Sequence, residues 1–384
     1  MVERLSKRIR LLDILRGFAI LGTLGTNVWI FANLGDISYV FTYAHATWWS
    51  SVDDFLRLTV LFLVNGKLLG LLTVMFGVGL ELKYRQSLRK GTAWPGVYLW
   101  TSFILLVEGL LHFTLVFEYD ILMSYAVTAI IVSFIVKRGD KGINRAMKII
   151  GGCHAAIILL ILLVSVYSSF SGANISLGDM DDVVLLYQDG TWAEQIQYRL
   201  ANFWLLRSEA IFVIPMNIFL FLTGVRLMRV GAFSPDEKGR RIRSKMLRIG
   251  LGLGIPLNLL TFVPGGMFDF PIRYLFAPLL SVGYIALIAK IVERKENFWL
   301  WSCLEAIGKM ALSCYVMQNI VSSVIFYGWG FGLGGKIGSL STIAIWLLIS
   351  LLQIGFAVVW LRRFKLGPME SARKYLSRLV VNGH

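Results

Sequence analysis

Unbroken apolar runs of roughly 18 to 25 residues recur along the whole chain, and this repetition constrains the fold more than any other sequence feature. A helix rises about 1.5 Å per residue, so each run can cross the ~30 Å hydrocarbon core of a bilayer. Hydrophobic residues make up 57% of the 384 residues and charged residues only 16%, which is too much apolar surface for a water-soluble domain to bury. We therefore predict an all-α, multi-pass membrane protein, a polytopic bundle of transmembrane helices.

The distribution of basic residues predicts the orientation of these helices. Lysine and arginine fall in short blocks in every second gap between the apolar runs, beginning with the N-terminal segment. The positive-inside rule then places both termini in the cytoplasm and requires an even number of spans. Because topology explains the net charge of +15, we expect a lipid bilayer and no nucleic acid as the partner. The ten predicted spans are residues 11–32, 56–80, 95–117, 120–136, 149–170, 201–225, 248–263, 273–290, 308–327 and 339–361.

The chain is predicted to form a single membrane domain over residues 1–384, because no internal repeat, heptad run or low-complexity tract divides it. Residues 33–55 and 171–200 are the longest predicted extracytoplasmic loops. Residues 226–248 form the predicted basic cytoplasmic loop, whose charge suits contact with anionic lipid headgroups. The three cysteines have no paired or metal-ligating spacing, so neither a disulfide framework nor a metal site is expected.

Ionisable residues inside the predicted spans are costly in hydrocarbon, so each is a candidate site residue. In the first span, Asp13 and Arg16 are three residues apart, and at ~100° per residue Arg16 and Asn27 share one helix face. Two interpretations of the charged pair stay open: the start of a polar route, or an ion pair that snorkels to the interface. Lys67, in the second span, lies too deep to snorkel easily and is expected to meet a carboxylate, a cavity or a bound anion.

Four ionisable residues gather in and after the third span. Glu108 and His112 stand one helical turn apart, so the carboxylate can fix the tautomer of the imidazole, as a proton relay requires. Glu118 and Asp120 follow near the predicted outer face. We interpret the group as a proton relay or substrate path, and an interhelical polar clasp is the alternative.

His45 lies in the first outer loop, within the sequence AHATWWSSVDDF. Beside Trp48 and Trp49 it fits an aromatic belt at the membrane surface. It also fits catalysis, because Asp53 and Asp54 are close enough in sequence to orient an imidazole base. The residues alone leave both interpretations open.

Four motifs together carry a resemblance to a known family. They are LDILRGFAILGTLGTN (12–27), NGKLLGLLTVMFGVG (65–79), EYDILMSYA (118–126) and IGKMALSCYVMQNIVSSVIFYGWGFGLGG (307–335). They occur in order over nearly the whole chain, and GPMESARKYL (367–376) resembles the usual C-terminal end of the family. On these motifs the chain is identified as a member of the bacterial membrane-protein family called domain of unknown function 418 (DUF418), the YeiB-like proteins. The resemblance implies a location in the bacterial cytoplasmic (inner) membrane.

The opening motif, an Asp followed by Arg-Gly-Phe-Ala, is also similar to that of acyltransferase family 3 and of the heparan-α-glucosaminide N-acetyltransferases. Acyltransferase family 3 proteins usually carry a histidine near the outer end of the first helix, where this chain has Asn27. In the glucosaminide acetyltransferases, the active histidine lies in the following luminal loop, in a His-Ala-Ser-Trp context. His45-Ala46-Thr47-Trp48 is similar and occupies the corresponding place. The similarity implies an acyl-transfer ancestry with His45 as the active histidine.

Acyl transfer is the first of two functions that the sequence supports. A membrane-bound O- or N-acyltransferase would move an acyl group from a cytoplasmic acyl-CoA-type donor substrate to a small-molecule or glycan acceptor outside. His45 would act as the base or transient acyl carrier, and Asn27 would donate a hydrogen bond to the developing oxyanion. The predicted catalytic residues are His45, Asn27, Asp53 and Asp54, and the predicted donor-binding residues are Arg16, Lys67 and Asp13.

Proton-coupled transport or export of a small solute is the second function. In that case Glu108, His112, Glu118 and Asp120 would be the proton-coupling or substrate groups along the path. We expect no permanently bound cofactor with either function, and an oligomer is compatible with both.

Overall fold

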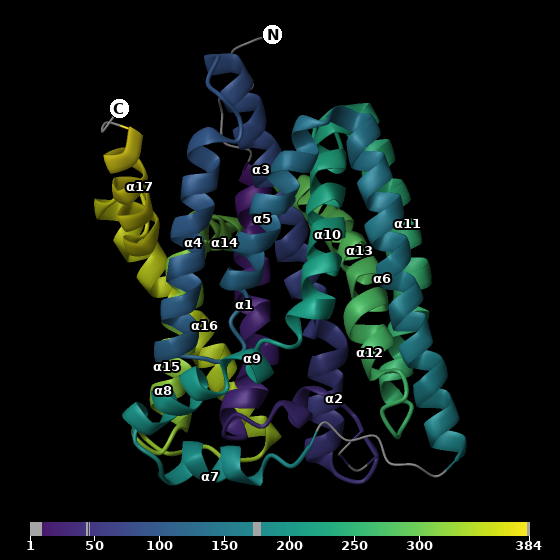
Figure 1. The fold of residues 1–384 in the computed structure, drawn as a ribbon, viewed down its shortest axis with the longest axis vertical. Helices are drawn as coiled ribbons and strands as arrows, with labels where there is room; N and C mark the ends of the chain where they lie inside the picture. The colour runs from purple at the N-terminus through teal and green to yellow at the C-terminus, as the bar shows by residue number, and fades with distance from the viewer. Residues whose placement is uncertain (1–9, 44, 46, 172–177, 382–384) are drawn as a thin grey trace.

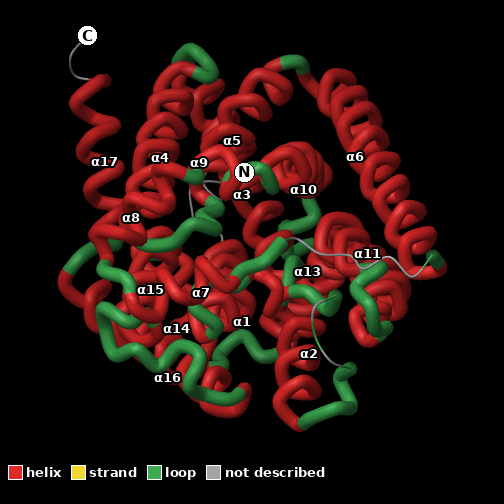
Figure 2. Tube along the Cα trace, turned by 60° about the horizontal axis from the view of Figure 1, so that its bottom comes forward, coloured by secondary structure: helices red, strands yellow, loops and turns green. Residues whose placement is uncertain are grey.

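The structure, a computed structural model, describes residues 10–43, 45, 47–171 and 178–381. Within these ranges every regular element is a helix, so the predicted all-α fold is confirmed. The described ends of the chain lie at the same end of the bundle, and the short helices α7 (Asp181–Asp189), α8 (Trp192–Ala201) and α9 (Phe203–Leu206) lie toward the opposite end (Figure 1). The long helix α6 lies at the margin of the bundle (Figure 2). It exposes apolar side chains such as Leu163 and Phe170, as expected of a helix that faces lipid.

Seven helical stretches of the described chain are long and apolar enough to cross a membrane, and an eighth is formed if the bent pair α14–α15 counts as one span. The pair is bent by 87°. The short apolar helix α5 and the half-polar helix α11 account for the remaining two of the ten predicted spans. The longer helices are α1 (Arg10–Ala32), α2 (Val52–Val64), α3 (Lys67–Lys90), α4 (Gly96–Leu115), α5 (Leu122–Lys137), α6 (Gly139–Phe170), α10 (Ala210–Val230), α11 (Glu237–Leu259), α13 (Ala277–Arg294), α14 (Trp299–Lys309), α15 (Ala311–Phe326), α16 (Ser339–Arg363) and α17 (Pro368–Val381).

The predicted loops contain much regular structure. Residues 33–55 include the 3-10 turn η2 (Ile37–Val40), and the described part of residues 171–200 forms α7 (Asp181–Asp189) and most of α8 (Trp192–Ala201). Residues 172–177 of that predicted loop lie outside the described residues. The predicted basic loop 226–248 is mainly the end of α10 and the start of α11, with a short turn between them.

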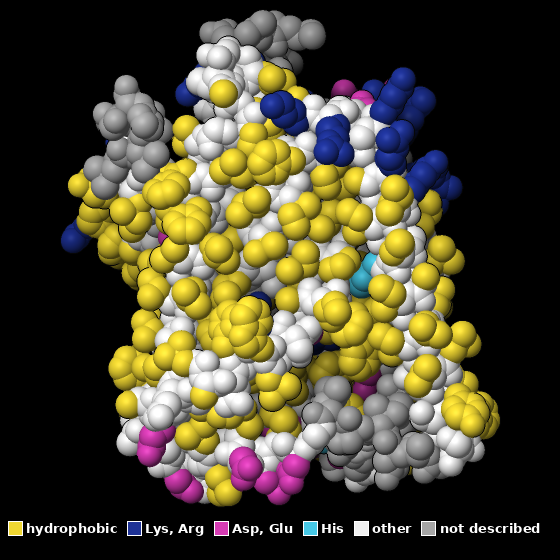
Figure 3. All heavy atoms as spheres, viewed as in Figure 1, with side chains coloured by type: hydrophobic (Ala, Val, Ile, Leu, Met, Phe, Trp, Pro, Cys, Tyr) yellow, Lys and Arg dark blue, Asp and Glu magenta, His cyan; other side chains and the backbone are white. Residues whose placement is uncertain are grey.

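Charge separates clearly between the two ends of the bundle (Figure 3). Lys and Arg side chains gather at the end where the chain termini lie, and the last turn of α3 ends there with Arg89 and Lys90. Asp and Glu side chains gather at the opposite end, where α7 begins with Asp181 and Asp182. We call these the basic end and the acidic end.

The helices at the centre approach one another closely because small residues face their neighbours. A Cβ atom added at Gly17 of α1 would lie 2.0 Å from the carbonyl oxygen of Leu304, and one added at Gly308 of α14 would lie 1.8 Å from that of Asp13. Both contacts require glycine, since a real Cβ cannot occupy that space. The LRGFA motif therefore fixes α1 against α14 by backbone contact, the packing that membrane helices commonly use.

Candidate functional site

A polar cavity lies among α1, α3, α5, α10 and α15, in the half of the bundle toward the acidic end. Its empty volume is about 930 Å³, including the space at its open side. Ionisable and amide groups at this depth are expensive unless they bind one another or a ligand. The polar lining residues are Thr23, Thr26, Asn27, Asn65, Tyr119, Asp120, Ser124, Arg207, Glu209, Arg273, Tyr274 and Tyr315.

Two interruptions of helical structure place side chains on the cavity wall. The chain breaks between α2 and α3 at Asn65 and Gly66, and Gly66 has a φ of +74°, a conformation that glycine adopts readily. The second interruption is a π-helical turn, η4 (Ile272–Phe276), which carries Arg273 and Tyr274. Arg273 then donates to the Asn65 Oδ1 atom at 3.1 Å and to Glu209 at 3.1 Å.

A buried histidine–aspartate pair adjoins the cavity, and Asp120 is the member of the pair that lies on the cavity wall. His112 Nδ1 lies 2.9 Å from Asp120 Oδ1, and its Nε2 atom lies 3.1 Å from the amide nitrogen of Asn319. The amide nitrogen of Asn27 lies 3.5 Å from Asn319 Oδ1. Because the amide donates to Nε2, the imidazole proton belongs on Nδ1, where Asp120 accepts it. A hydrogen-bonded chain thus leads from Asp120 through His112 and Asn319 to Asn27.

The structure contradicts the predicted pairing of Glu108 with His112. Glu108 binds the guanidinium of Arg373, which belongs to α17 at the basic end of the bundle. Although Glu108 and His112 are one turn apart, the rotation of α4 against its neighbours gives each a different partner. His112 binds Asp120 instead, which lies eight positions along the chain from His112 and beyond the end of α4.

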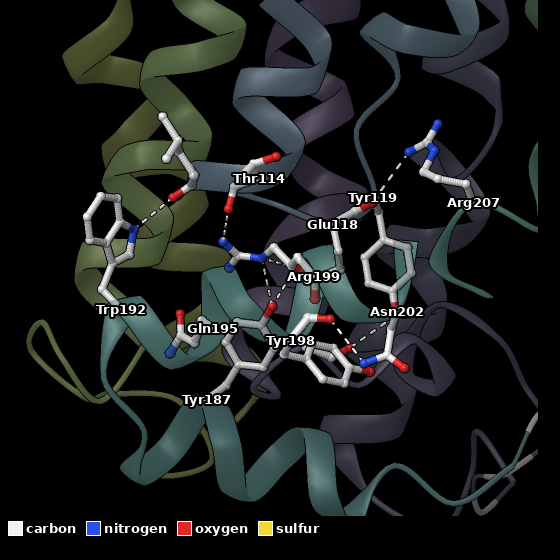
Figure 4. Close-up of polar contacts among 12 residues, drawn as sticks. Thr114, Glu118, Tyr119, Tyr187, Trp192, Gln195, Tyr198, Arg199, Asn202 and Arg207 are labelled. Carbon is white, nitrogen blue, oxygen red and sulfur yellow. Dashed lines mark hydrogen bonds and ion pairs between the residues drawn. The ribbon is translucent and has the colours of Figure 1, made fainter. Parts of the chain in front are cut away.

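Glu118 lies in a second buried network rather than on the same path. Its Oε2 atom accepts from Tyr187 at 2.8 Å and lies 3.4 Å from Arg199 Nε, and both charged side chains are 1% exposed (Figure 4). Arg199 also donates to the carbonyl oxygen of Thr114 at 3.1 Å. The predicted relay of four residues is therefore two separate pairs, His112–Asp120 and Glu118–Arg199, with Glu108 bound elsewhere.

Arg207 contacts the same stretch of chain from the cavity side (Figure 4). It donates to the carbonyl oxygen of Asp120 at 2.9 Å, to that of Glu118 at 3.4 Å, and to Ser124 Oγ at 3.2 Å. Its guanidinium also lies 5.7 Å from the centre of the Phe113 ring. Each of these partners is electrically neutral.

The predicted donor-binding residues do not line the cavity. Asp13 and Arg16 form an ion pair at 3.2 Å near the start of α1, as one of the two interpretations expected. Lys67 is fully buried at the start of α3, where its Nζ atom lies 3.4 Å from the Leu61 carbonyl oxygen and 5.8 Å from the Phe62 ring centre. No ion pair of Lys67 occurs among the described residues. The three residues are therefore not brought together.

His45 lines a separate outer pocket at the acidic end, with an empty volume of about 810 Å³. Its Nε2 atom lies 3.4 Å from Ser38 Oγ, and its ring centre lies 4.4 Å from that of Tyr39. Burial, followed by the positive charge of Arg57, lowers the pKa of His45 to about 4, so the imidazole is neutral at neutral pH. Ala46 of the predicted His-Ala-Thr-Trp motif lies outside the described residues.

Asp53 and Asp54 line the outer pocket too, but neither is bound to His45. Asp53 accepts from the backbone N–H of Ser339 at 2.5 Å, at the start of α16. Asp54 binds Ser51 within the first turn of α2 and lies 3.7 Å from Arg57. The two carboxylates are thus engaged at helix N-termini, where the dipole favours them, and the predicted orientation of the imidazole by either one is not observed.

Residues 39–43, which we call the partition segment, connect the outer pocket, which Tyr39 lines, with the cavity residue Asn65, which contacts Val40. Asn65 donates to the carbonyl oxygen of Val40, and Arg57 donates to those of Tyr39 and Phe41. The carboxylate of Asp269 accepts from the backbone N–H and hydroxyl of Thr42 and from the backbone N–H of Tyr43. Six hydrogen bonds therefore hold the segment in place.

An apolar pocket of about 320 Å³ adjoins the polar cavity on the other side. The two share Ile121 and Tyr315 in their walls. Arg373 of α17 also lines the apolar pocket. The remaining lining residues are Ile20, Leu72, Phe76, Leu105, Leu122, Tyr125, Ala311 and Leu312. Three pockets consequently follow one another, from Arg373 toward the basic end to His45 at the acidic end.

Comparison with known proteins identifies a matching family model and several proteins of similar sequence. Residues 227–379 match the family model described as protein of unknown function (DUF418). The chain is 25% identical to the uncharacterized protein YxaH of Bacillus subtilis (strain 168), over 95% of this chain and 93% of that protein. It is 26% identical to the uncharacterized protein YeiB of Escherichia coli (strain K12), over 94% and 93% of the two chains. Over residues 227–379, the chain is therefore similar to the DUF418 family. A protein described as an uncharacterized 39.9 kDa protein in the amylase 3′ region of Bacillus acidopullulyticus is 24% identical to this chain, over 95% of it.

Sequence reasoning does not identify Arg207, Glu209 and Arg273 as cavity residues. Arg273 stands at the end of a predicted span, where membrane topology alone accounts for it. The available signal is the pair Arg207 and Glu209 near the start of the sixth span, where each charge adds cost at membrane depth. The interruptions at Gly66 and η4 bring these residues together, and the first of them falls on the turn-forming dipeptide Asn65-Gly66, which the predicted span 56–80 runs through.

Proposed function

We propose that this protein is a membrane acyltransferase of the bacterial cytoplasmic membrane, with ten spans and both termini in the cytoplasm. It would move an acyl group from a cytoplasmic acyl-CoA-type donor to an acceptor outside. The basic end then faces the cytoplasm, in accord with the positive-inside rule.

The observation that carries the proposal is the order of the three pockets. An apolar pocket near α17 leads to a polar cavity that holds Asn27, and the partition segment connects this cavity with the outer pocket that holds His45. An acyl thioester suits these two pockets, because its acyl chain is apolar and its carbonyl group needs polar hydrogen-bond donors. Arg16 and Lys67 have no role at the donor in this proposal, since neither lines these pockets.

The chemistry follows from the residues at the outer two pockets. Neutral His45 takes the proton of an acceptor hydroxyl or amine while the acceptor atom attacks the thioester carbonyl carbon. The amide of Asn27 donates a hydrogen bond to the oxyanion that forms. The carbon–sulfur bond then breaks, and the departing thiolate receives a proton from the imidazolium. This sequence requires the partition segment to move aside, which joins Asn27 and His45 in one space.

The experiment measures acyl-CoA turnover by the purified protein in nanodiscs, with thiol release as the readout and acetyl-CoA and decanoyl-CoA as donors. His45→Ala should abolish turnover, and Ile337→Ala in the same outer pocket should retain it. Because the pKa of His45 lies at about 4, activity should persist as the pH falls and should drop only as the pH approaches 4. Equal turnover by the wild type and His45→Ala would remove His45 from the mechanism.

Proton-coupled passage of a small solute is a second candidate, and the buried His112–Asp120 pair favours it. A carboxylate at a cavity wall that is hydrogen-bonded to an imidazole is the arrangement used for proton coupling. Asp120 is the residue to test, because Glu108 is bound to Arg373 instead of His112. In proteoliposomes, uptake driven by a pH gradient that is lost in Asp120→Asn but kept in His45→Ala would favour transport over acyl transfer.

A further inference from the structure

The cavity and the apolar pocket together have the shape of a site for one kind of ligand. We propose that they bind an amphiphilic monocarboxylate, with the carboxylate at Arg207 and the apolar tail in the pocket lined by Leu105 and Leu122. The inference goes beyond acyl transfer, because binding of a free acid requires neither a donor nor turnover.

The charges on the cavity wall indicate an anionic head group. Glu209 accepts hydrogen bonds from both Arg273 and Tyr274, and Asp120 is bound to His112, so these groups have charged or polar partners. Arg207 is different, since it contacts two backbone carbonyl oxygens, one hydroxyl and one ring. No carboxylate lies within ion-pair distance of Arg207 among the described residues. Arg207 is half-buried, and the carboxylate of Glu209, whose charge acts on it, is hydrogen-bonded to Arg273 instead. An incoming anion would therefore be the first carboxylate to hydrogen-bond to the Arg207 guanidinium.

The hydrogen bonds of Arg207 leave room for that anion. Its bond to the Glu118 carbonyl oxygen is long, at 3.4 Å, and therefore weak. A guanidinium has five N–H groups in a planar fork, which suits the two oxygen atoms of a carboxylate. Ser124 and Asn27 line the same cavity, and their hydroxyl and amide groups can donate further hydrogen bonds to the head group.

The apolar pocket indicates the tail. It shares Ile121 and Tyr315 with the cavity, so a chain that starts at Arg207 can continue into it without crossing solvent. Its other walls are mostly aliphatic or aromatic side chains, with Arg373 as the charged exception. Polar solutes gain no affinity in such a pocket, whereas each buried methylene raises the affinity about fourfold.

The binding experiment uses the full-length protein in nanodiscs and radiolabelled decanoate as the probe, with binding to empty nanodiscs subtracted. Decan-1-ol has the same tail without charge, and butyrate has the same head with a short tail. Decanoate should bind at least about tenfold more tightly than decan-1-ol, because a charge-assisted hydrogen bond contributes more than a factor of ten in affinity. It should also bind at least about tenfold more tightly than butyrate, because butyrate lacks most of the apolar tail. Equal binding of decanoate and decan-1-ol by the wild type would overturn the proposal without any variant.

Two substitutions then locate the two parts of the ligand. Arg207→Met should weaken decanoate binding about tenfold, and the matched change Arg241→Met, at an exposed ion pair of the basic end, should leave it unchanged. Leu122→Trp should fill the apolar pocket and abolish the preference for decanoate over butyrate. Unchanged decanoate affinity in both Arg207→Met and Leu122→Trp would contradict the site. Loss of decanoate binding in Arg207→Met with normal acyl-CoA turnover would leave the acyltransferase proposal standing.

Discussion

Arg199 and Arg207 lie close together in the sequence and hold the same stretch of chain, residues 114–124, yet their surroundings differ. Arg199 donates to a carboxylate, a phenol and a carbonyl oxygen, and it is 1% exposed. Arg207 donates only to neutral oxygen atoms and faces a cavity. Figure 4 shows the two side chains with Glu118 and Tyr119 between them.

The difference separates a structural arginine from one that can accept a ligand. The charge of Arg199 is compensated within the protein, and its pairing with Glu118 ties α8 to the bundle. The guanidinium of Arg207 donates hydrogen bonds, but among the described side chains no carboxylate lies within ion-pair distance of it. We therefore expect substitutions at Arg199 to change stability and substitutions at Arg207 to change binding.

Replacement of one partner of the buried pair should have the largest effect. Arg199→Met leaves the carboxylate of Glu118 buried without its counter-ion, so we expect a loss of about 3–5 kcal/mol in the free energy of unfolding. Denaturant unfolding of the protein in detergent measures this loss. The double variant Arg199→Met with Glu118→Leu should recover part of it, because no charge then remains buried. A double variant as unstable as the single one would show that the charge is not the cause.

Tyr187→Phe removes one hydrogen bond from the same network, and its effect on stability should depend on pH. The change removes the hydroxyl that donates to Glu118 and should cost about 1–3 kcal/mol near neutral pH. Burial, followed by the nearby charge of Glu118, raises the pKa of Tyr187 well above its usual 10. The unfolded chain therefore loses this proton first as the pH rises above 10, and native stability falls there. The difference in unfolding free energy between the wild type and Tyr187→Phe should therefore become smaller above pH 10. A difference that stays constant with pH would contradict this role of the Tyr187 proton.

Ser124→Ala should have the smallest effect. It removes one neutral acceptor of Arg207, and we expect a loss of about 0.5–1.5 kcal/mol in unfolding free energy. The guanidinium and its charge remain, so decanoate affinity should change far less than in Arg207→Met. A loss of binding as large as that of Arg207→Met would mean that the position of Arg207, and not its charge, is what the site needs.

The sequence predicts the helices better than their interruptions. The predicted span 11–32 nearly coincides with α1, because its apolar run is long and bounded by charge. The predicted span 56–80 instead covers parts of α2 and α3, divided at Gly66. The dipeptide Asn65-Gly66 is a turn signal at this point, but the long apolar runs on both sides outweigh it, since many other glycines in this chain lie within helices.

Partners across the bundle could not be predicted from spacing along one helix. His112 and Glu108 satisfy the one-turn rule, but which neighbour each meets depends on the rotation and tilt of α4 in the bundle. The chain of His112, Asn319 and Asn27 joins three helices that no local pattern connects. Asn27, in contrast, lines the cavity together with Thr23 and Thr26 on the same side of α1, a placement that depends only on the period of a single helix, whereas Arg16 does not line the cavity.

The partition segment also sets a limit on timing. Two hydrogen bonds from Arg57, one from Asn65 and three to Asp269 must be broken before the outer pocket and the cavity become one space. At about 0.5–1.5 kcal/mol each, the six sum to about 3–9 kcal/mol. At the lower bound of this energy, fewer than roughly one molecule in a hundred has the partition segment open at any instant, and at higher energies the open fraction is smaller still. The rate of any event that needs both compartments is therefore limited by how often this short stretch opens, and a bound ligand can raise that rate only by favouring the open form.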